Sequence, residues 1–212
     1  PTVQLLNPAG GSERLDLEIW RGGTVYQQTY VRGAPQTPLL TMGVTEKRGT
    51  KVTFKPDAQI FETTEYSFDI LAQRLRELAF LNAGIVITLD DERDAKSHRF
   101  HYDGGINSFV EHLNKNKGVV HDKPIYMHGV KDGIDAEVSM QWNDTYNPQE
   151  FSFANNINTH EGGTHLSGFR AALTRTINAY AARNNLTKDL KDATISGDDI
   201  REGMVAVISV KI

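Results

Sequence analysis

The residues best suited to chemistry are two arginines, Arg170 and Arg175, on a predicted helix that follows the pair Gly162-Gly163. A guanidinium on an extended side chain can contact a nucleic-acid phosphate without reading the base sequence. Five residues rotate a helix by about 140°, so the two arginines cannot share one narrow stripe of its surface. The pattern is typical of a phosphate-contacting helix, and equally of an ordinary solvated helix face.

The glycine pair before this helix also has two interpretations. Free backbone amides at a helix N-terminus can cradle a phosphate, whereas a tight glycine turn allows a strand and a helix to pack closely. His160 and His165 flank the turn, but the bend between them removes the same-face spacing of a zinc site. We therefore predict no metal site at this position or elsewhere in the chain.

Composition narrows the class of protein. The chain has 212 residues, of which 39% are hydrophobic and 24% charged, which suffices for one or two domains with a core. Its formal net charge of −4 argues against a generally basic surface, so nucleic acid would have to meet a local patch. The sequence contains no cysteine, and no apolar run approaches the roughly 20 residues that cross a bilayer. We expect a cytoplasmic protein that does not enter a membrane.

Hydrophobic periodicity predicts more strands than helices. Because the strands come in consecutive runs, the expected fold class is α+β rather than alternating α/β. Gly104-Gly105 interrupts the pattern and is predicted as a domain boundary. The expected elements, in chain order, are a hairpin within 15–31, a strand at 51–55, a helix over 64–82, strands at 85–89 and 99–102, a short helix ending before 118, strands at 124–130, 134–142 and around 151–153, a helix over 164–183 and a strand at 204–212.

Four stretches, in the same order along the chain, resemble the B subunit of bacterial DNA gyrase, the ATPase subunit of a type IIA topoisomerase. They are residues 45–54, 74–82, 102–106 and 161–175. The resemblance covers roughly residues 12–212. It implies the C-terminal part of a GHKL ATPase domain, a partial sheet-and-helix layer, in residues 12–105. Residues 106–212 would be a C-terminally truncated transducer domain, of the β-α-β type found in domain 2 of a ribosomal protein. Residues 1–11 do not resemble the family, and they are expected to stand in place of the missing nucleotide-binding half, either as an engineered splice or as a short ordered remnant.

The resemblance also implies roles for single residues. In the family, the strand that matches residues 49–54 forms the adenine side of the nucleotide pocket, with Thr50 and Val52 at the matching positions. A threonine hydroxyl can share a hydrogen bond with an adenine edge, and a valine can pack on the ring. The family's transducer helix faces the cavity through which DNA passes, which implies DNA contact for Arg170 and, less directly, for Arg175. Without the resemblance, Thr50 and Val52 would belong to an ordinary core strand.

Motifs of the family's catalytic machinery are missing from the sequence. It has neither the Glu-x-x-x-Asn helix motif nor the Asp-x-Gly-x-Gly adenine motif, and it stops before the lysine loop that reaches the terminal phosphate. Hydrolysis needs a positioned base, a metal ion and phosphate-binding donors together. We therefore expect no catalytic residue and no ATPase activity in the isolated chain. ATP and magnesium would bind tightly only to the intact subunit.

The resemblance thus implies a fragment of a subunit that relays ATP binding and hydrolysis to DNA strand passage and supercoiling. The implied partners are DNA, the gyrase A protein and a second copy of the same chain in a homodimer. Two alternatives stay open: a fragment of the corresponding ATPase subunit of topoisomerase IV, which shares these motifs, and a non-catalytic module that binds nucleic acid or protein. With half of the ATPase layer missing, residues 12–105 should also expose apolar surface unless another segment or a second copy covers it.

Overall fold

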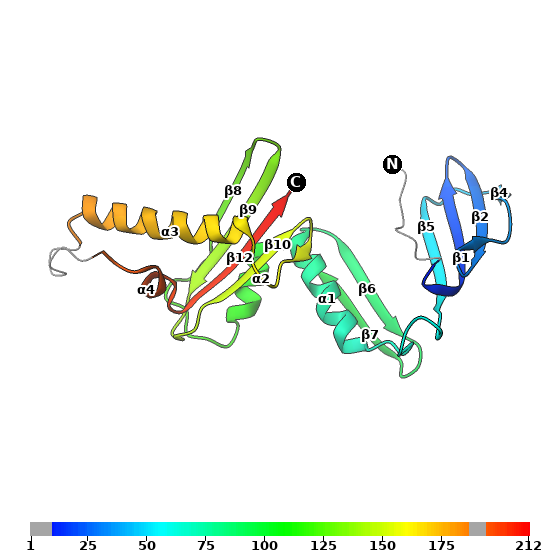
Figure 1. Ribbon diagram of the computed structural model, residues 1–212, viewed down its shortest axis with the longest axis horizontal. Helices are drawn as coiled ribbons and strands as arrows, with labels where there is room; N and C mark the ends of the chain where they lie inside the picture. Colours follow the sequence, from blue (N-terminus) through cyan, green and yellow to red (C-terminus); the bar gives the residue numbers. More distant parts are fainter. Residues whose placement is uncertain (1–9, 187–193) are drawn as a thin grey trace. The chain divides into compact units, whose positions relative to one another are not determined.

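The chain forms two compact units, residues 1–67 and 68–212 (Figure 1). The computed structural model describes residues 10–186 and 194–212. The predicted boundary at Gly104-Gly105 therefore falls inside the second unit, because the helix and hairpin that precede it pack with the elements that follow it. The predicted division into an ATPase part, residues 12–105, and a transducer part, residues 106–212, rests on the family resemblance and not on packing. It stays a prediction.

The first unit is a five-stranded antiparallel sheet in which the predicted hairpin is present. Gly22 and Gly23 form its turn, with φ angles of 59° and 78° that suit a two-residue hairpin loop. The strand path is β3-β2-β1-β5, and β4 also pairs with β2. The strands are β1 (Ser12–Arg21), β2 (Thr24–Val31), β3 (Ala34–Pro35), β4 (Leu40–Val44) and β5 (Gly49–Pro56).

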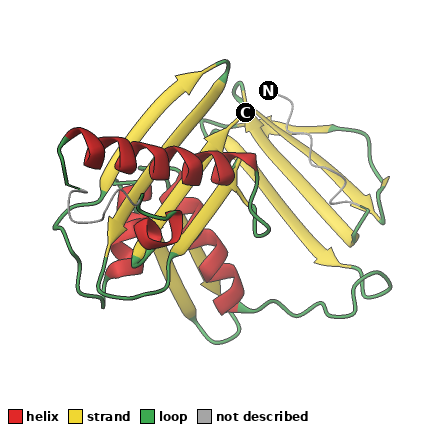
Figure 2. Cartoon of the chain, turned by 60° about the vertical axis from the view of Figure 1, so that its left-hand side comes forward, coloured by secondary structure: helices red, strands yellow, loops and turns green. Residues whose placement is uncertain are grey.

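The second unit contains a five-stranded sheet in the order β11-β10-β12-β9-β8, in which β10 and β12 run parallel (Figure 1). Figure 2 shows the strands of the chain in yellow and its helices in red. A separate hairpin and the helix that packs on it lead into this sheet. This mixture of helices and mainly antiparallel strands confirms the predicted α+β class. The elements are α1 (Phe68–Leu81), β6 (Val86–Asp91), β7 (Lys96–His101), α2 (Ile106–Asn114), β8 (Ile125–Lys131), β9 (Ile134–Trp142), β10 (Gln149–Ala154), β11 (Ile157–Asn158), α3 (Thr164–Arg183), α4 (Gly197–Arg201) and β12 (Met204–Lys211).

Strand β12 is the centre of the second unit, since its side chains enter two different cores. Val205 and Val207 pack in the core formed with α2. Met204, Ala206 and Ile208 point to the opposite side and pack in the core formed with α3. Alternate residues of a strand face opposite sides of a sheet, so a strand covered on both sides is apolar at most positions, and Ser209 is the buried polar residue of β12. The two helices therefore lie on opposite faces of the sheet.

Helix α1 joins the hairpin β6–β7 to this core. Its buried Ala72 and Ala79 pack with Phe100 of β7. At its C-terminal end the Phe80 ring stacks on Tyr102 and on Phe109 of α2, with ring centroids 3.8 Å and 4.8 Å away. The helix begins at Phe68, four residues later than predicted. In the preceding segment the Thr63 hydroxyl accepts a bond from the Glu65 amide, a local contact that competes with helix formation.

Replacement of Gly203 would combine backbone strain with a steric collision. Gly203, just before β12, has a φ of 69°, and a Cβ atom there would lie 2.3 Å from the carbonyl oxygen of Asn143. No helix in the described ranges is long and apolar enough to span a membrane.

We expect Gly203→Ala to lower the free energy of unfolding by about 3 kcal/mol or more, because backbone strain and a collision with fixed carbonyl groups add together. Gly133→Ala is the matched control, since Gly133 has a φ of 81° and open space around its Cβ position. That variant should lose only about 1 kcal/mol, from strain alone. Urea unfolding of both proteins measures the difference, and equal losses would contradict the packing described for Gly203.

Candidate functional site

Thr50 and Val52 lie two residues apart on β5, so both side chains face the same side of the first sheet. Their partners on β1 are Ile19 and Leu17. Residues directly opposite each other in a sheet share a face. Thr50 therefore stands on a mainly apolar surface of the sheet.

This surface is open in the described part of the chain. Thr50 is exposed, and Val52 and Phe54 are 38% and 50% exposed. The expectation of exposed apolar surface on this segment is thus confirmed. The depression of about 240 Å³ on the same sheet is lined instead by residues that include Asp16, Glu18 and Lys51, which alternate with the apolar positions. Thr50 and Val52 do not line this depression.

The glycine turn before α3 is explained in part by backbone geometry. Gly162 has a φ of 79°, in the left-handed region that favours glycine, whereas Gly163 is extended and could hold another residue by this criterion. Gly163 is the N-cap, and no side chain caps the helix. The first core-facing residue, Leu166, is 8% exposed. The turn thus directs α3 across the sheet so that its apolar stripe packs against β12.

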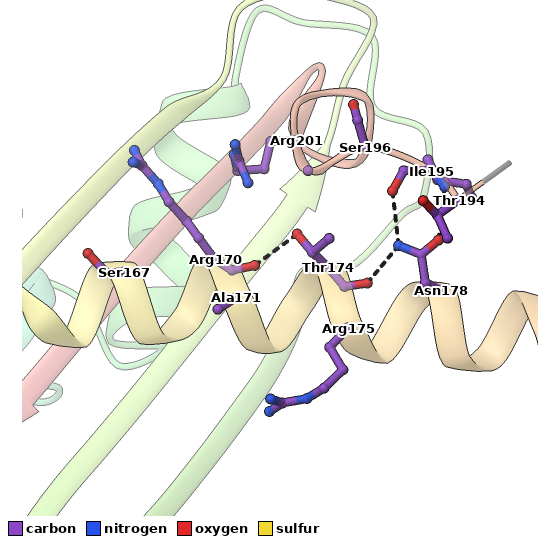
Figure 3. A pocket seen from close by; sticks show the side chains of 11 residues that line it. Ser167, Arg170, Ala171, Thr174, Arg175, Asn178, Thr194, Ile195, Ser196 and Arg201 are labelled. Atoms are coloured by element: carbon purple, nitrogen blue, oxygen red, sulfur yellow. Dashed lines mark hydrogen bonds between the residues drawn. The ribbon is translucent and has the colours of Figure 1, made fainter.

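Arg170 and Arg175 leave α3 in different directions, as their spacing predicted (Figure 3). Arg170 is on the side that faces β10 and α4. Its Nε donates to both carboxylate oxygens of Glu150, at 3.1 and 3.0 Å, and a terminal nitrogen also contacts Glu150. The Glu150 hydrogen bond raises the pKa of the Arg170 guanidinium above its usual value. Arg170 is therefore held in a fixed position, by a partner that no sequence pattern indicates.

The two members of this ion pair differ in burial. The Glu150 side chain is only 6% exposed, whereas the Arg170 side chain is 45% exposed. The carboxylate thus depends on the arginine for compensation, while the arginine keeps a solvent-facing edge. Arg175 is exposed, and none of the ion pairs within the described ranges includes it.

A depression of about 700 Å³ lies between α3 and α4, and its lining residues include Arg170, Arg175 and Arg201. Figure 3 shows Arg170 and Arg201 on one side of α3, with Arg175 pointing away. Arg201 pairs with Asp198 at 2.7 Å. Sequence reasoning missed Arg201, although the capping box formed by Ser196 and Asp199 could have indicated the short helix that carries it.

One amide holds the two walls of this depression together. Asn178 of α3 donates to the carbonyl oxygen of Ile195 at 2.9 Å and accepts from the Ile195 amide at 2.9 Å. The segment that leads into α4 is therefore pinned to α3 by a pair of hydrogen bonds, and Figure 3 shows Asn178 and Ile195 facing each other.

A second cavity, of about 580 Å³, lies at the glycine turn. It is lined by acidic residues from three elements or turns, Glu77, Glu150 and Glu161, and by Arg170. Arg170 thus borders both cavities. No group of three or more His, Asp or Glu side chains in residues 10–186 and 194–212 is arranged to hold a metal ion. The cavity is a polar space with one paired cation at its edge.

Comparison with known proteins identifies the family. The family model described as DNA gyrase B matches residues 105–212, which are 108 of the 212 residues. The chain belongs to the DNA gyrase B family. Among curated relatives of this family, the DNA gyrase B protein of Myxococcus xanthus is 56% identical over 201 residues, covering 95% of the chain and 24% of the relative. The chain thus spans about a quarter of that relative's length, and half of the length of the relative from Bacillus mycoides.

Solved structures in the gyrase B family have the same fold. The 43K ATPase domain of Thermus thermophilus gyrase B, solved with an aminocoumarin, superposes with a TM-score of 0.84 at 35% identity. The match covers 96% of this chain and 56% of that domain. The topoisomerase IV ATP-binding domain of Francisella tularensis, solved with a small-molecule inhibitor, gives a TM-score of 0.79 at 25% identity. These structures confirm the fold of both units of this gyrase B family chain.

We expect Arg170→Ala to lower the free energy of unfolding by about 1–2 kcal/mol, because it leaves the nearly buried Glu150 carboxylate without its partner. Arg175→Ala is the control on the same helix and should change stability by less than about 0.5 kcal/mol. Thermal unfolding at neutral pH measures both variants. A melting curve for Arg170→Ala that coincides with that of Arg175→Ala would show that the ion pair contributes nothing.

Proposed function

We propose that this chain is part of a DNA gyrase B protein, in which it relays ATP binding and hydrolysis to DNA strand passage and supercoiling. The observation that carries the proposal is the 56% identity with a gyrase B relative over 95% of the chain. The fold comparison supports it, since the chain aligns with more than half of a gyrase B ATPase domain. The isolated chain is proposed to lack ATPase activity, since it lacks the family's general-base motif.

We propose that the two functional parts of the chain meet at the predicted boundary, Gly104-Gly105. Residues 12–105 would belong to the ATPase domain and residues 106–212 to the transducer, which is supported by a family match that begins at residue 105. Residues 1–11 would lie outside the family region. Packing of Phe80 on Phe109 links α1 to α2 across that boundary. A displacement of α1 would therefore also displace α2, because close-packed side chains transmit strain.

In the proposed nucleotide site, Thr50 and Val52 form the adenine-side wall. The Thr50 hydroxyl would hydrogen-bond at the edge of the base, and Val52 would pack on the ring. Their exposure and shared face support this role. Bound ATP, with magnesium, would supply the free energy for the conformational cycle. The remaining walls and the metal ligands would come from other parts of the intact protein.

In the proposed DNA contact, Arg170 and Arg175 of α3 meet the phosphate backbone without reading the base sequence. The solvent-facing edge of Arg170 and the exposure of Arg175 support this assignment. The further partners proposed for the intact protein are gyrase A and a second gyrase B chain in a homodimer, in the cytoplasm. Gyrase is favoured over topoisomerase IV, because the matching family model is described as DNA gyrase B and the curated relatives from Myxococcus xanthus and Bacillus mycoides are DNA gyrase B proteins.

The test is a chimera in which residues 12–212 replace the matching segment of Myxococcus xanthus gyrase B. Together with gyrase A of that organism it should supercoil relaxed plasmid in the presence of ATP. Thr50→Ala in the chimera should raise the ATP concentration needed for half-maximal activity. Arg170→Ala should reduce supercoiling more than ATP turnover. A well-folded chimera that hydrolyses ATP without supercoiling DNA would contradict the relay proposed for this segment.

A further inference from the structure

The ion pair between Arg170 and Glu150 limits what Arg170 can do as a DNA contact. Glu150 already accepts from the Nε edge of the guanidinium and from a terminal nitrogen. This is one of the two edges with which an arginine binds a carboxylate or a phosphate through two parallel hydrogen bonds. A phosphate that approaches this edge would therefore have to compete with the Glu150 carboxylate for the same donors.

The acidic surroundings add to this competition. Glu150 comes from β10, and Asp198 of α4 is a further acidic group whose charge acts on Arg170. Glu77 of α1 lines the same cavity as Glu150, but it is paired with Arg74 at 3.0 Å. On the basic side, Arg201 borders the depression beside Arg170 and is paired with Asp198. The charged groups nearest to Arg170 thus favour its present position.

We propose that Glu150 is a positioning residue that restrains the DNA contact made by Arg170: the Nε edge of the guanidinium can bind a backbone phosphate of duplex DNA only by exchanging the Glu150 carboxylate for it. This inference rests on the proposed DNA contact of α3. The exchange leaves Glu150, whose side chain is 6% exposed, without a cation. The restraint comes from this cost, because an unpaired carboxylate in a poorly solvated site is unfavourable. Arg170 thereby binds DNA more weakly than an unpaired arginine at the same position.

Glu150→Gln tests the inference, since the amide preserves the size of the side chain and removes its charge. The matched control is Glu161→Gln, which removes one negative charge from the lining of the same cavity. None of the ion pairs in the described residues includes Glu161. The control therefore reports the general effect of a less negative protein on DNA affinity.

The measurement is fluorescence anisotropy of a labelled random-sequence DNA duplex, titrated at several salt concentrations with the complete 212-residue chain. The proteins are the unmodified chain, Glu150→Gln, Glu161→Gln, Arg170→Ala and the double variant Glu150→Gln/Arg170→Ala. Glu150→Gln should increase affinity by about threefold to tenfold, clearly more than Glu161→Gln. The double variant should lose this gain, and the salt dependence should fall by about one counterion relative to Glu150→Gln.

The outcomes separate this inference from the proposed function. If Arg170→Ala weakens binding but Glu150→Gln does not strengthen it beyond the control, the restraint is wrong and the DNA contact stands. If Glu150→Gln strengthens binding through Arg170, while Arg170→Ala alone changes nothing, the restraint is supported and the native contact of Arg170 is contradicted. A gain that persists in the double variant, or an absence of DNA binding by every protein, overturns the inference.

Discussion

Burial of β12 on both faces is the constraint on which the second unit depends. Its alternating side chains must be covered on two sides, by α2 on one and α3 on the other, and covering a large apolar side chain contributes roughly 1.5–3 kcal/mol relative to exposure. Leu166 and Leu173 attach α3 to this core, which places Arg170 beside β10 and directs it to Glu150. Arg175, five residues later, belongs neither to that core nor to that ion pair. The two arginines have different environments because α3 packs on the sheet through one apolar stripe, and helical geometry places Arg170 and Arg175 at different angles from that stripe.

The first unit presents a different physical situation, because its described residues form a sheet and no helix. Val52 and Phe54 remain substantially exposed there. An apolar sheet surface beside a threonine is suited to an aromatic ligand or to another protein layer, since either would remove that surface from water. The proposed adenine wall and the incomplete layer are thus two aspects of the same exposed strand.

The sequence alone determined the periodic features of this protein: the α+β class, the hairpin of the first sheet, the apolar strand at 204–212 and the divergence of Arg170 from Arg175. Each depends on local repeat lengths or turn chemistry, which neighbouring residues specify. Its motifs also identified the family. The short strands β3, β4 and β11 and the helix α4 escaped prediction because they contain too few residues to show a period.

Only the tertiary structure decided the environment of each candidate residue. Glu150 and Arg170 are 20 residues apart in the chain, and their contact depends on how α3 packs across β10. The two compact units likewise divide before α1 rather than at Gly104-Gly105, because Phe80 is buried against α2. Long-range packing of this kind leaves no local pattern in the residues that it brings together. For that reason the sequence indicated Arg170 as a candidate cation, whereas only the fold showed that the Glu150 carboxylate pairs with it.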